Sequence, residues 1–261
     1  MIIQAKDFTT DILSNKKLIS FDLDGTLVES KTKISNSMRD TFNLLLEKYL
    51  VNAISGGKYS IFQENLVNEI TKDQNLLKKL TLSPTCGAVM YVYENNEWIA
   101  SYKDALDKEV INQIFEAFDY AMKKFGHNPE QLYGDIIEDR ETQVTFSAYG
   151  QMAPLELKNT WDPTQAKRRE LVKYLNEKLD NLDIKIAGTT SIDITKKGIN
   201  KGYGIKKLAA YLNISLDEIL FIGDALFEGG NDRPVADIGV TSIQIKDVPE
   251  CENLIKKIIN C

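Results

Sequence analysis

Phe21-Asp22-Leu23-Asp24-Gly25-Thr26-Leu27 is the most informative stretch of the chain, because it joins an apolar run to a loop that carries two carboxylates. The run from Lys17 to Phe21 is typical of a strand buried on both faces of a parallel sheet. Ligands of open parallel sheets bind beyond the carboxyl ends of the strands, where this loop must lie. Asp22 and Asp24 can therefore both face a ligand, one as a nucleophile and the other as a general acid or base.

A calcium-binding loop is the main alternative for this stretch, because its pattern of carboxylates followed by glycine is superficially similar. Gly25 comes too early for such a loop, no glutamate lies at the distance needed for a bidentate ligand, and a strand precedes the motif. The residues therefore favour catalysis over calcium binding.

The hydrophobic pattern predicts alternating strands and helices at both ends of the chain. The predicted elements before Pro84 are a strand ending at Phe21, a helix over 38–49, a strand over 50–54 and a helix over 59–70. The pattern between them changes to hairpin-like strands over 86–102 and 132–148, a helix over 105–125, a helix opening at Asp162-Pro163, and strands over 183–187 and 190–195. Strands near 218–222 and 237–245 and a helix over 248–259 follow.

This order predicts an α/β protein with a Rossmann-like parallel-sheet core and an inserted α+β cap domain. We expect residues 1–85 to form the first part of the core, 86–196 the cap and 197–261 the second part of the core.

The composition bounds the function. The chain has 261 residues and a net charge of −6, so nothing indicates a nucleic-acid or membrane-surface partner. Three cysteines without metal-type spacing, and an N-terminus without a signal-peptide pattern, lead us to expect a cytoplasmic protein. The single histidine, His127, is expected in a surface loop, which argues against a Ser-His-Asp mechanism.

The stretch from Phe21 to Leu27 resembles the signature of the haloacid dehalogenase superfamily. The resemblance implies a Ser or Thr after the second strand, for which Ser55 is the candidate, and a lysine that shields charge on the attacking carboxylate. Lys201 is the candidate for that lysine, with Lys196 and Lys197 as rivals. An ordinary turn serine and solvated lysines are the alternatives for these positions.

A fourth motif of the superfamily is an acidic metal site after an apolar strand, here Gly223-Asp224 followed by Asn231-Asp232. Carboxylates from two strand ends, with a backbone carbonyl, suit the octahedral oxygen coordination of Mg²⁺. The expected metal ligands are Asp22, Asp24 through its carbonyl, and Asp224, with Asp232 tuning the site. A helix cap is the alternative role for Asp224.

The long loop from Gly223 to Asp232 and the Ser55-Gly56-Gly57 turn narrow the resemblance to the eukaryotic-type phosphomannomutases. That resemblance implies contacts to the sugar and its phosphate from the cap, and the matching residues are Arg140, Arg168, Ser191 and Asp193. Arg168 lies in phase with the apolar stripe of its helix, and Ser191 and Asp193 alternate with isoleucines. Surface charge and an ordinary half-buried strand are the alternatives.

Two positions depart from the mutase pattern: Gln151 and Lys31 stand where the family has arginines. Losing a fork-shaped guanidinium weakens phosphate binding. We include both residues among the substrate-binding candidates.

The resemblance implies a hexose-phosphate mutase that interconverts mannose 6-phosphate and mannose 1-phosphate, with glucose phosphates as further substrates. Mg²⁺ and a hexose 1,6-bisphosphate activator would be required, and a homodimer through the cap is a further hypothesis. A sugar-phosphate phosphatase of the same superfamily is the closest alternative, since it shares the core chemistry. A catalytically silent binding protein is disfavoured because every motif residue is present.

Overall fold

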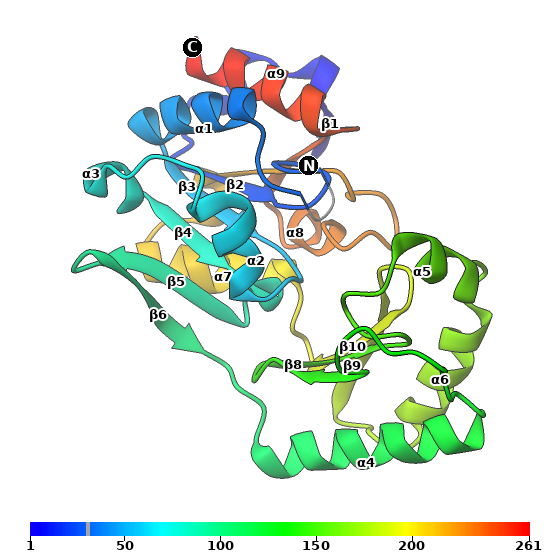
Figure 1. Cartoon of the computed structure of the whole chain (residues 1–261). Helices are drawn as coiled ribbons and strands as arrows, with labels where there is room; N and C mark the ends of the chain where they lie inside the picture. The colour runs from blue at the N-terminus through cyan, green and yellow to red at the C-terminus, as the bar shows by residue number, and fades with distance from the viewer. Residues whose placement is uncertain (30–31) are drawn as a thin grey trace. The chain divides into compact units, whose positions relative to one another are not determined.

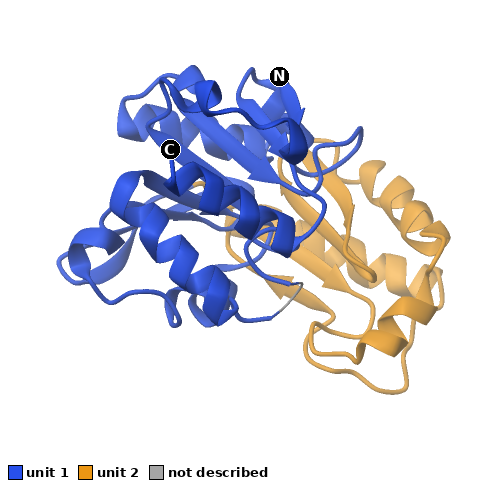
Figure 2. Cartoon of the chain, turned by 90° about the horizontal axis from the view of Figure 1, so that it is seen from above, with its two compact units in different colours: residues 1–103, 199–261 blue, residues 104–198 orange. Residues whose placement is uncertain are grey.

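The structure, a computed structural model, describes residues 1–29 and 32–261. The chain divides into two compact units, which Figure 2 shows in different colours. Unit 1 comprises Met1–Lys103 and Ile199–Cys261, and unit 2 comprises Asp104–Gly198. The interrupted core and the inserted second domain are therefore as expected in kind, but the first crossing comes after residue 103 instead of residue 85.

Unit 1 is built on an eight-stranded sheet with the order β1-β12-β11-β2-β3-β4-β5-β6 (Figure 1). The strands are β1 Ile2–Gln4, β2 Leu18–Asp22, β3 Leu50–Ile54, β4 Leu80–Ser83, β5 Val89–Glu94, β6 Glu97–Lys103, β11 Ile219–Gly223 and β12 Thr241–Gln244. Its helices are α1 Asn36–Lys48, α2 Tyr59–Phe62, α3 Gln74–Leu77, α7 Lys201–Leu212, α8 Arg233–Asp237 and α9 Val248–Ile259. The strands from β1 to β4 in the sheet order pair in parallel.

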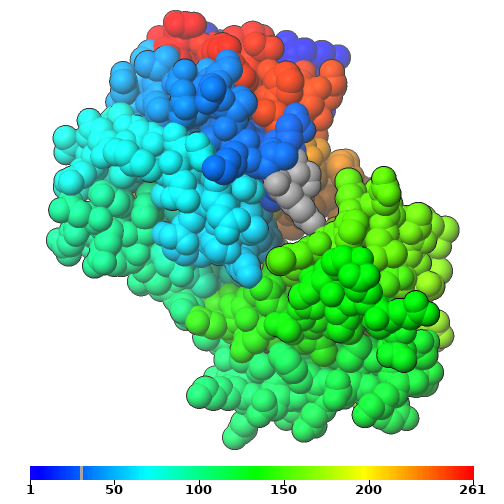
Figure 3. All heavy atoms as spheres, in the orientation of Figure 1, coloured from blue at the N-terminus to red at the C-terminus, as the bar shows by residue number. Residues whose placement is uncertain are grey.

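Both faces of this sheet are covered, which explains why its central strands are continuous apolar runs. Successive side chains of a strand point to opposite faces. Ile19 and Phe21 of β2 therefore pack in one cluster with α1 and α9, whereas Leu18 packs in a second cluster with α7. Helix α9 lies against α1, so the last helix of the chain covers an early one (Figure 3).

The β5–β6 hairpin corrects the predicted domain boundary. The sequence pattern correctly indicates two antiparallel strands here, but β5 pairs with β4 through Thr81 and Val92 and so extends the sheet of unit 1. Both strands therefore belong to the core and not to the cap.

Unit 2 is an antiparallel sheet, in the order β7-β8-β10-β9, with helices packed on one face. Its elements are α4 Lys108–Lys124, β7 Ile137–Asp139, β8 Gln143–Ser147, α5 Leu155–Trp161, α6 Ala166–Asn176, β9 Leu182–Ala187 and β10 Ser191–Lys196. Val144 and Phe146 of β8 and Ile192 and Ile194 of β10 join residues of α4 and α6 in its core. The opposite face of β8 and β10 carries their polar side chains.

Three local predictions differ from the structure in detail. The helix expected at Asp162-Pro163 begins at Ala166, because Asp162 uses its side chain to cap the helix from outside. The helix expected over 59–70 is α-helical only to Phe62 and continues as a π-helical turn. His127 does lie in the loop after α4, but it is half-buried, since its ring packs against Phe146 and Trp161 and hydrogen-bonds to the Ala148 carbonyl.

Within the described ranges 1–29 and 32–261, no helix combines the length and the apolar character needed to span a bilayer.

Candidate active site

The candidate active site lies at the carboxyl ends of two neighbouring parallel strands of unit 1. Asp22 ends β2, and Asp224 follows the last residue of β11; the two strands pair directly, with Phe21 opposite Ile222. Asp232 joins them from the loop after β11, and the three carboxylates each place an oxygen within 4.8 Å of the others. Parallel pairing therefore brings together three acidic residues spread over 211 positions of sequence.

Gly25 makes room for this cluster. Its φ of +81° is in the left-handed region, and a Cβ atom there would lie 2.6 Å from Oδ2 of Asp224. A side chain at this position would therefore displace the Asp224 carboxylate, which gives the glycine of the motif a second role beyond the turn.

Lys201 neutralises part of the acidic cluster. It is the first residue of α7, whose start is fixed by Asn200, since the Asn200 side chain accepts a hydrogen bond from the N–H of Tyr203. The Lys201 ammonium is fully buried and lies 2.5 Å from Oδ1 of Asp22 and 2.6 Å from Oδ1 of Asp232. The rivals Lys196 and Lys197 belong to unit 2, and only Lys201 makes these contacts among the three lysines.

The electrostatics leave an excess of negative charge. Burial, reinforced by Asp232 and Asp224, raises the pKa of Asp22 to about 8 against the opposing effect of Lys201. Burial and the charge of Asp232 likewise raise the pKa of Asp224. Burial alone would lower the pKa of Lys201, but its two carboxylate partners raise it, so the lysine stays charged. Three carboxylates against one ammonium suit a hard divalent cation, and the donor set fits Mg²⁺.

Asp24 and Ser55 lie together beside this cluster. The Ser55 hydroxyl donates to Oδ2 of Asp24 at 3.4 Å and accepts a hydrogen bond from the N–H of Gly57 at 3.0 Å. Ser55 thus shapes its own Ser-Gly-Gly turn, as an ordinary turn serine does, and also contacts the expected general acid or base. The Asp24 carboxylate is not part of the three-carboxylate cluster found among the described residues.

In unit 2, the polar face of the sheet carries Ser191 and Asp193 of β10. Asp193 lies opposite Thr145 of β8, whose hydroxyl donates to Oδ1 of Asp193 at 2.8 Å and accepts from Nε2 of Gln143. Burial raises the pKa of Asp193, and nearby Arg140 partly offsets this effect. Arg140 donates from Nε and Nη2 to Oε2 of Glu138, both at 2.7 Å.

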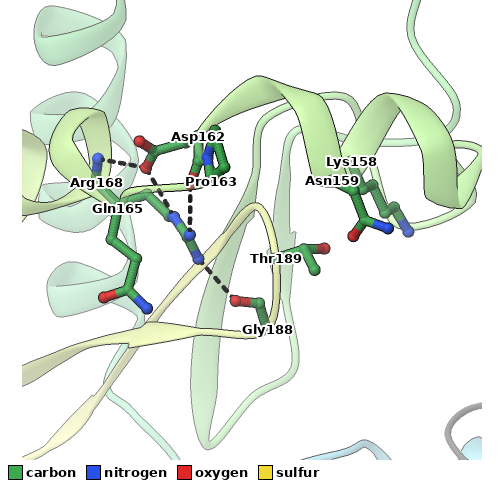
Figure 4. Close-up of a pocket in the computed structure, with 8 residues that line it drawn as sticks. All are labelled: Lys158, Asn159, Asp162, Pro163, Gln165, Arg168, Gly188 and Thr189. Atoms are coloured by element: carbon green, nitrogen blue, oxygen red, sulfur yellow. Dashed lines mark hydrogen bonds and ion pairs between the residues drawn. The ribbon is translucent and has the colours of Figure 1, made fainter.

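Arg168 lies elsewhere in unit 2 and has a different environment from the one expected. Its side chain is buried, its Nε donates to Asp162 at 3.0 Å, and Nη2 donates to the Asp162 carbonyl. Nη1 donates to the carbonyls of Ala187 and Gly188, so the guanidinium ties the start of α6 to the turn after β9 (Figure 4). The prediction that Arg168 points inward is confirmed. Its guanidinium donates to protein oxygens, however, and not toward a phosphate site.

The remaining substrate-binding candidates are Gln151 and Lys31. The Gln151 side-chain nitrogen is buried and has no hydrogen-bond partner among the described residues, while its backbone carbonyl accepts from Nζ of the buried Lys158 at 2.6 Å. Lys31 lies outside the described residues.

Comparison with known proteins places this geometry in a family. Residues 19–233 match the family model described as haloacid dehalogenase-like hydrolase. The chain belongs to the haloacid dehalogenase-like hydrolase family. The matched range runs from β2 through unit 2 to the Asp232 loop, so it includes all the carboxylates of the cluster.

The sequence identity to individual proteins is modest, although the similarity covers most of the chain. A phosphomannomutase of Spinacia oleracea is 25% identical over 229 residues, which cover 82% of this chain and 84% of that protein. Among solved structures, C-terminal truncated Plasmodium falciparum IMP-nucleotidase superposes with a TM-score of 0.70 at 18% identity, covering 95% of this chain and 73% of that one. Aspergillus fumigatus trehalose-6-phosphate phosphatase gives 0.60 at 17% identity, covering 97% and 96%. These structures confirm the α/β fold.

The sequence did not predict a role for three polar residues of unit 2, which are Gln143, Thr145 and Lys158. Gln143 and Thr145 support Asp193, and their alternation with Val144 and Phe146 was a usable signal for a polar sheet face. Lys158 gave no such signal, because nothing local distinguishes a buried lysine from a solvated one.

Proposed function

We propose that the protein is a Mg²⁺-dependent phosphoryl-transfer enzyme that works through an aspartyl-phosphate on Asp22. The observation that carries this proposal is the buried contact of Lys201 with Asp22 and Asp232, beside the third carboxylate of Asp224. Asp22, Asp224 and Asp232 are the residues that would hold the cation, together with the Asp24 carbonyl. When bound, Mg²⁺ offsets the repulsion between the phosphoryl group and the carboxylates.

The chain's own residues supply the remaining steps of the proposed reaction. A carboxylate oxygen of Asp22 attacks phosphorus, and the bond between phosphorus and the ester oxygen breaks. Asp24 gives its proton to the departing oxygen, and in the second half it takes a proton from the hydroxyl group that attacks the aspartyl-phosphate. Lys201 holds the Asp22 oxygen in place, and the Ser55 hydroxyl would turn from Asp24 to donate to a phosphoryl oxygen.

The finer proposal is a hexose-phosphate mutase that interconverts mannose 6-phosphate and mannose 1-phosphate, primed by a hexose 1,6-bisphosphate. It is supported by the phosphomannomutases, which match most of the chain at about a quarter identity. Ser191 and Asp193 are the proposed contacts to the sugar, and Arg140 is the proposed contact to a second phosphate. The cytoplasmic location and the homodimer through the cap stay predictions.

A sugar-phosphate phosphatase is the second candidate, and a specific observation favours it. A mutase must bind a second phosphate, but Arg168 spends its donors on Asp162 and on two backbone carbonyls. Gln151 also carries no charge where the resemblance leads us to expect an arginine. A phosphatase needs no arginine at either position. Water attacks its aspartyl-phosphate in place of a sugar hydroxyl, so no second phosphate has to be bound.

One incubation separates the two. The full-length protein is mixed with Mg²⁺, mannose 1-phosphate and a trace of glucose 1,6-bisphosphate, and the products are separated by chromatography. Mannose 6-phosphate identifies a mutase, whereas free mannose and inorganic phosphate identify a phosphatase. If neither product forms with this or any other sugar phosphate tried, and Asp22→Asn behaves like wild type, the enzymatic proposal is wrong.

A further inference from the structure

Gln244, the last residue of β12, makes an unusual set of side-chain contacts next to the acidic cluster. Its Nε2 donates to the backbone carbonyl of Asp224 at 2.5 Å and to the carbonyl of Ile245 at 2.6 Å. Its Oε1 accepts from the N–H of Leu226 at 2.8 Å. A single primary amide thus satisfies backbone groups on both sides of Ala225, one residue beyond Asp224.

Only a primary amide of this length matches the contacts. Both N–H groups are used on carbonyl oxygens and the oxygen is used on an N–H, so donors and acceptor are all in demand. A glutamate would turn a second acceptor toward the carbonyls of Asp224 and Ile245, and an asparagine would be one methylene too short. The amide is also partly buried, where unmet backbone groups are costly.

The loop after Asp224 is held by a second set of hydrogen bonds, which come from Asp232 of the acidic cluster. Oδ2 of Asp232 accepts from the N–H of Ala225 at 3.0 Å, and the N–H of Asp232 donates to the Ala225 carbonyl. Gly230 lies so close that a Cβ atom there would be 2.0 Å from the Ala225 oxygen. Gln244 holds the same loop from the sheet. Strand β12 pairs with β11 and places Gln244 opposite Gly223, next to Asp224.

We propose that Gln244 is a positioning residue that holds Asp224 in place to bind the divalent cation. The Asp224 carboxylate is exposed to repulsion from the Asp232 carboxylate, which favours its movement away from the cluster. The hydrogen bonds of Gln244 to the Asp224 carbonyl and the Leu226 N–H keep the main chain at Asp224 from moving away from the cluster. Gln244 touches neither the cation nor the substrate, and it acts only through Asp224. The inference rests on the proposed cation-dependent function.

The test measures Mg²⁺ binding to the full-length protein by isothermal titration calorimetry, without substrate. Gln244→Met removes both donors and the acceptor while keeping the length and the charge of the site. Gln74→Met is the matched control, since Gln74 is exposed on α3 of the same unit. Losing a hydrogen-bonded neighbour of a metal ligand weakens metal binding by about 10- to 100-fold. We expect a rise in Kd of that order for Gln244→Met and none for Gln74→Met.

Turnover gives a second readout that a merely structural role would not move. The Mg²⁺ concentration for half-maximal rate should rise with Kd in Gln244→Met, while the rate at saturating Mg²⁺ returns to near that of wild type. If Gln244→Met does not fold, Gln244→Asn keeps the amide on a shorter stem and should show the same weaker binding.

The outcomes separate this inference from the function on which it rests. If wild type binds Mg²⁺ and a folded Gln244 variant binds it equally well, the positioning role is wrong and the proposed function stands. The same conclusion holds if only the melting temperature falls. If wild type itself binds no Mg²⁺, the cation-dependent function and the role of Gln244 are both overturned.

Discussion

Removing the Lys201 ammonium should expose the electrostatic imbalance of the site as a pH-dependent loss of stability. Lys201→Met keeps an unbranched side chain of similar length but leaves Asp22 and Asp232 without their shared cation. The ammonium is fully buried and contacts both carboxylates at 2.6 Å or less. Breaking a buried pair by removing one partner typically destabilises a protein by about 3–5 kcal/mol. For a protein of this size that loss is roughly 6–20 °C in melting temperature.

The loss should depend on pH in a defined direction. Asp22 already has its pKa raised to about 8 with the lysine present, and without it the pKa rises further. A carboxyl group whose pKa is higher in the folded state contributes stability at low pH, and that contribution disappears as the pH rises through the folded-state value. At pH 5.5 and 7 Asp22 keeps its proton in both proteins, so the loss should be constant there. It should grow as the pH rises above about 8, because wild type then releases that proton and the variant keeps it.

Urea denaturation at pH 5.5, 7 and 9 without Mg²⁺ measures both the size and the direction of the effect. Lys206→Met is the control, because Lys206 is exposed on the same helix and undergoes the same chemical change. A loss for Lys201→Met no greater than that for Lys206→Met, or a loss that is the same at every pH, would refute the electrostatic account of the cluster.

Other perturbations test neighbouring parts of the site. Asp22→Asn should abolish phosphoryl transfer, because an amide cannot form the acyl-phosphate, and turnover above about a tenth of wild type would remove Asp22 as the nucleophile. Asp24→Asn should slow turnover by roughly 10²–10⁴-fold with binding of phosphate analogues retained; collapse of that binding would make Asp24 structural. The rise in melting temperature on adding Mg²⁺ should be larger at pH 8 than at pH 6, because the cation displaces the Asp22 proton, and an equal rise would contradict the raised pKa. Arg168→Ala should lose about 3–5 kcal/mol of unfolding free energy in urea, whereas exposed Arg169→Ala should lose almost none.

Much of unit 1 could be predicted from the sequence because local signals agree with the tertiary fold. Strand β3 has the predicted bounds Leu50–Ile54, since an apolar run ends at a Ser-Gly-Gly turn. Helix α9 has the predicted bounds 248–259, because Asp247 caps it, Pro249 lies in its first turn, and its apolar residues share one face. The alternation of strands and helices predicts a parallel sheet. In such a sheet the residues that follow neighbouring strands, here Asp22 and Asp224, lie at the same edge.

The β5–β6 hairpin shows where such reasoning fails. Its local pattern indicates two antiparallel strands, and both strands exist. Which sheet they join depends on the pairing of Thr81 with Val92, and no local periodicity encodes that choice. The same limit applies to Asp162, whose side chain caps α6 from outside instead of opening a helix, because its ion pair with Arg168 decides the matter.

Arg168 also changes the argument about function. The helical phase correctly placed it on the inward face, and a buried arginine near a ligand site is a reasonable phosphate-binding group. Burial has a second explanation, however, which is an ion pair that fastens one element to another. Arg168 meets that description, because its side chain joins Asp162 to the turn at Gly188. Burial also would have raised the pKa of Asp162, yet hydrogen bonds from Arg168 hold it below its usual range. A mutase built on this chain must therefore bind its second phosphate through other groups, and Arg140, whose charge acts on Asp193, is the one that we propose.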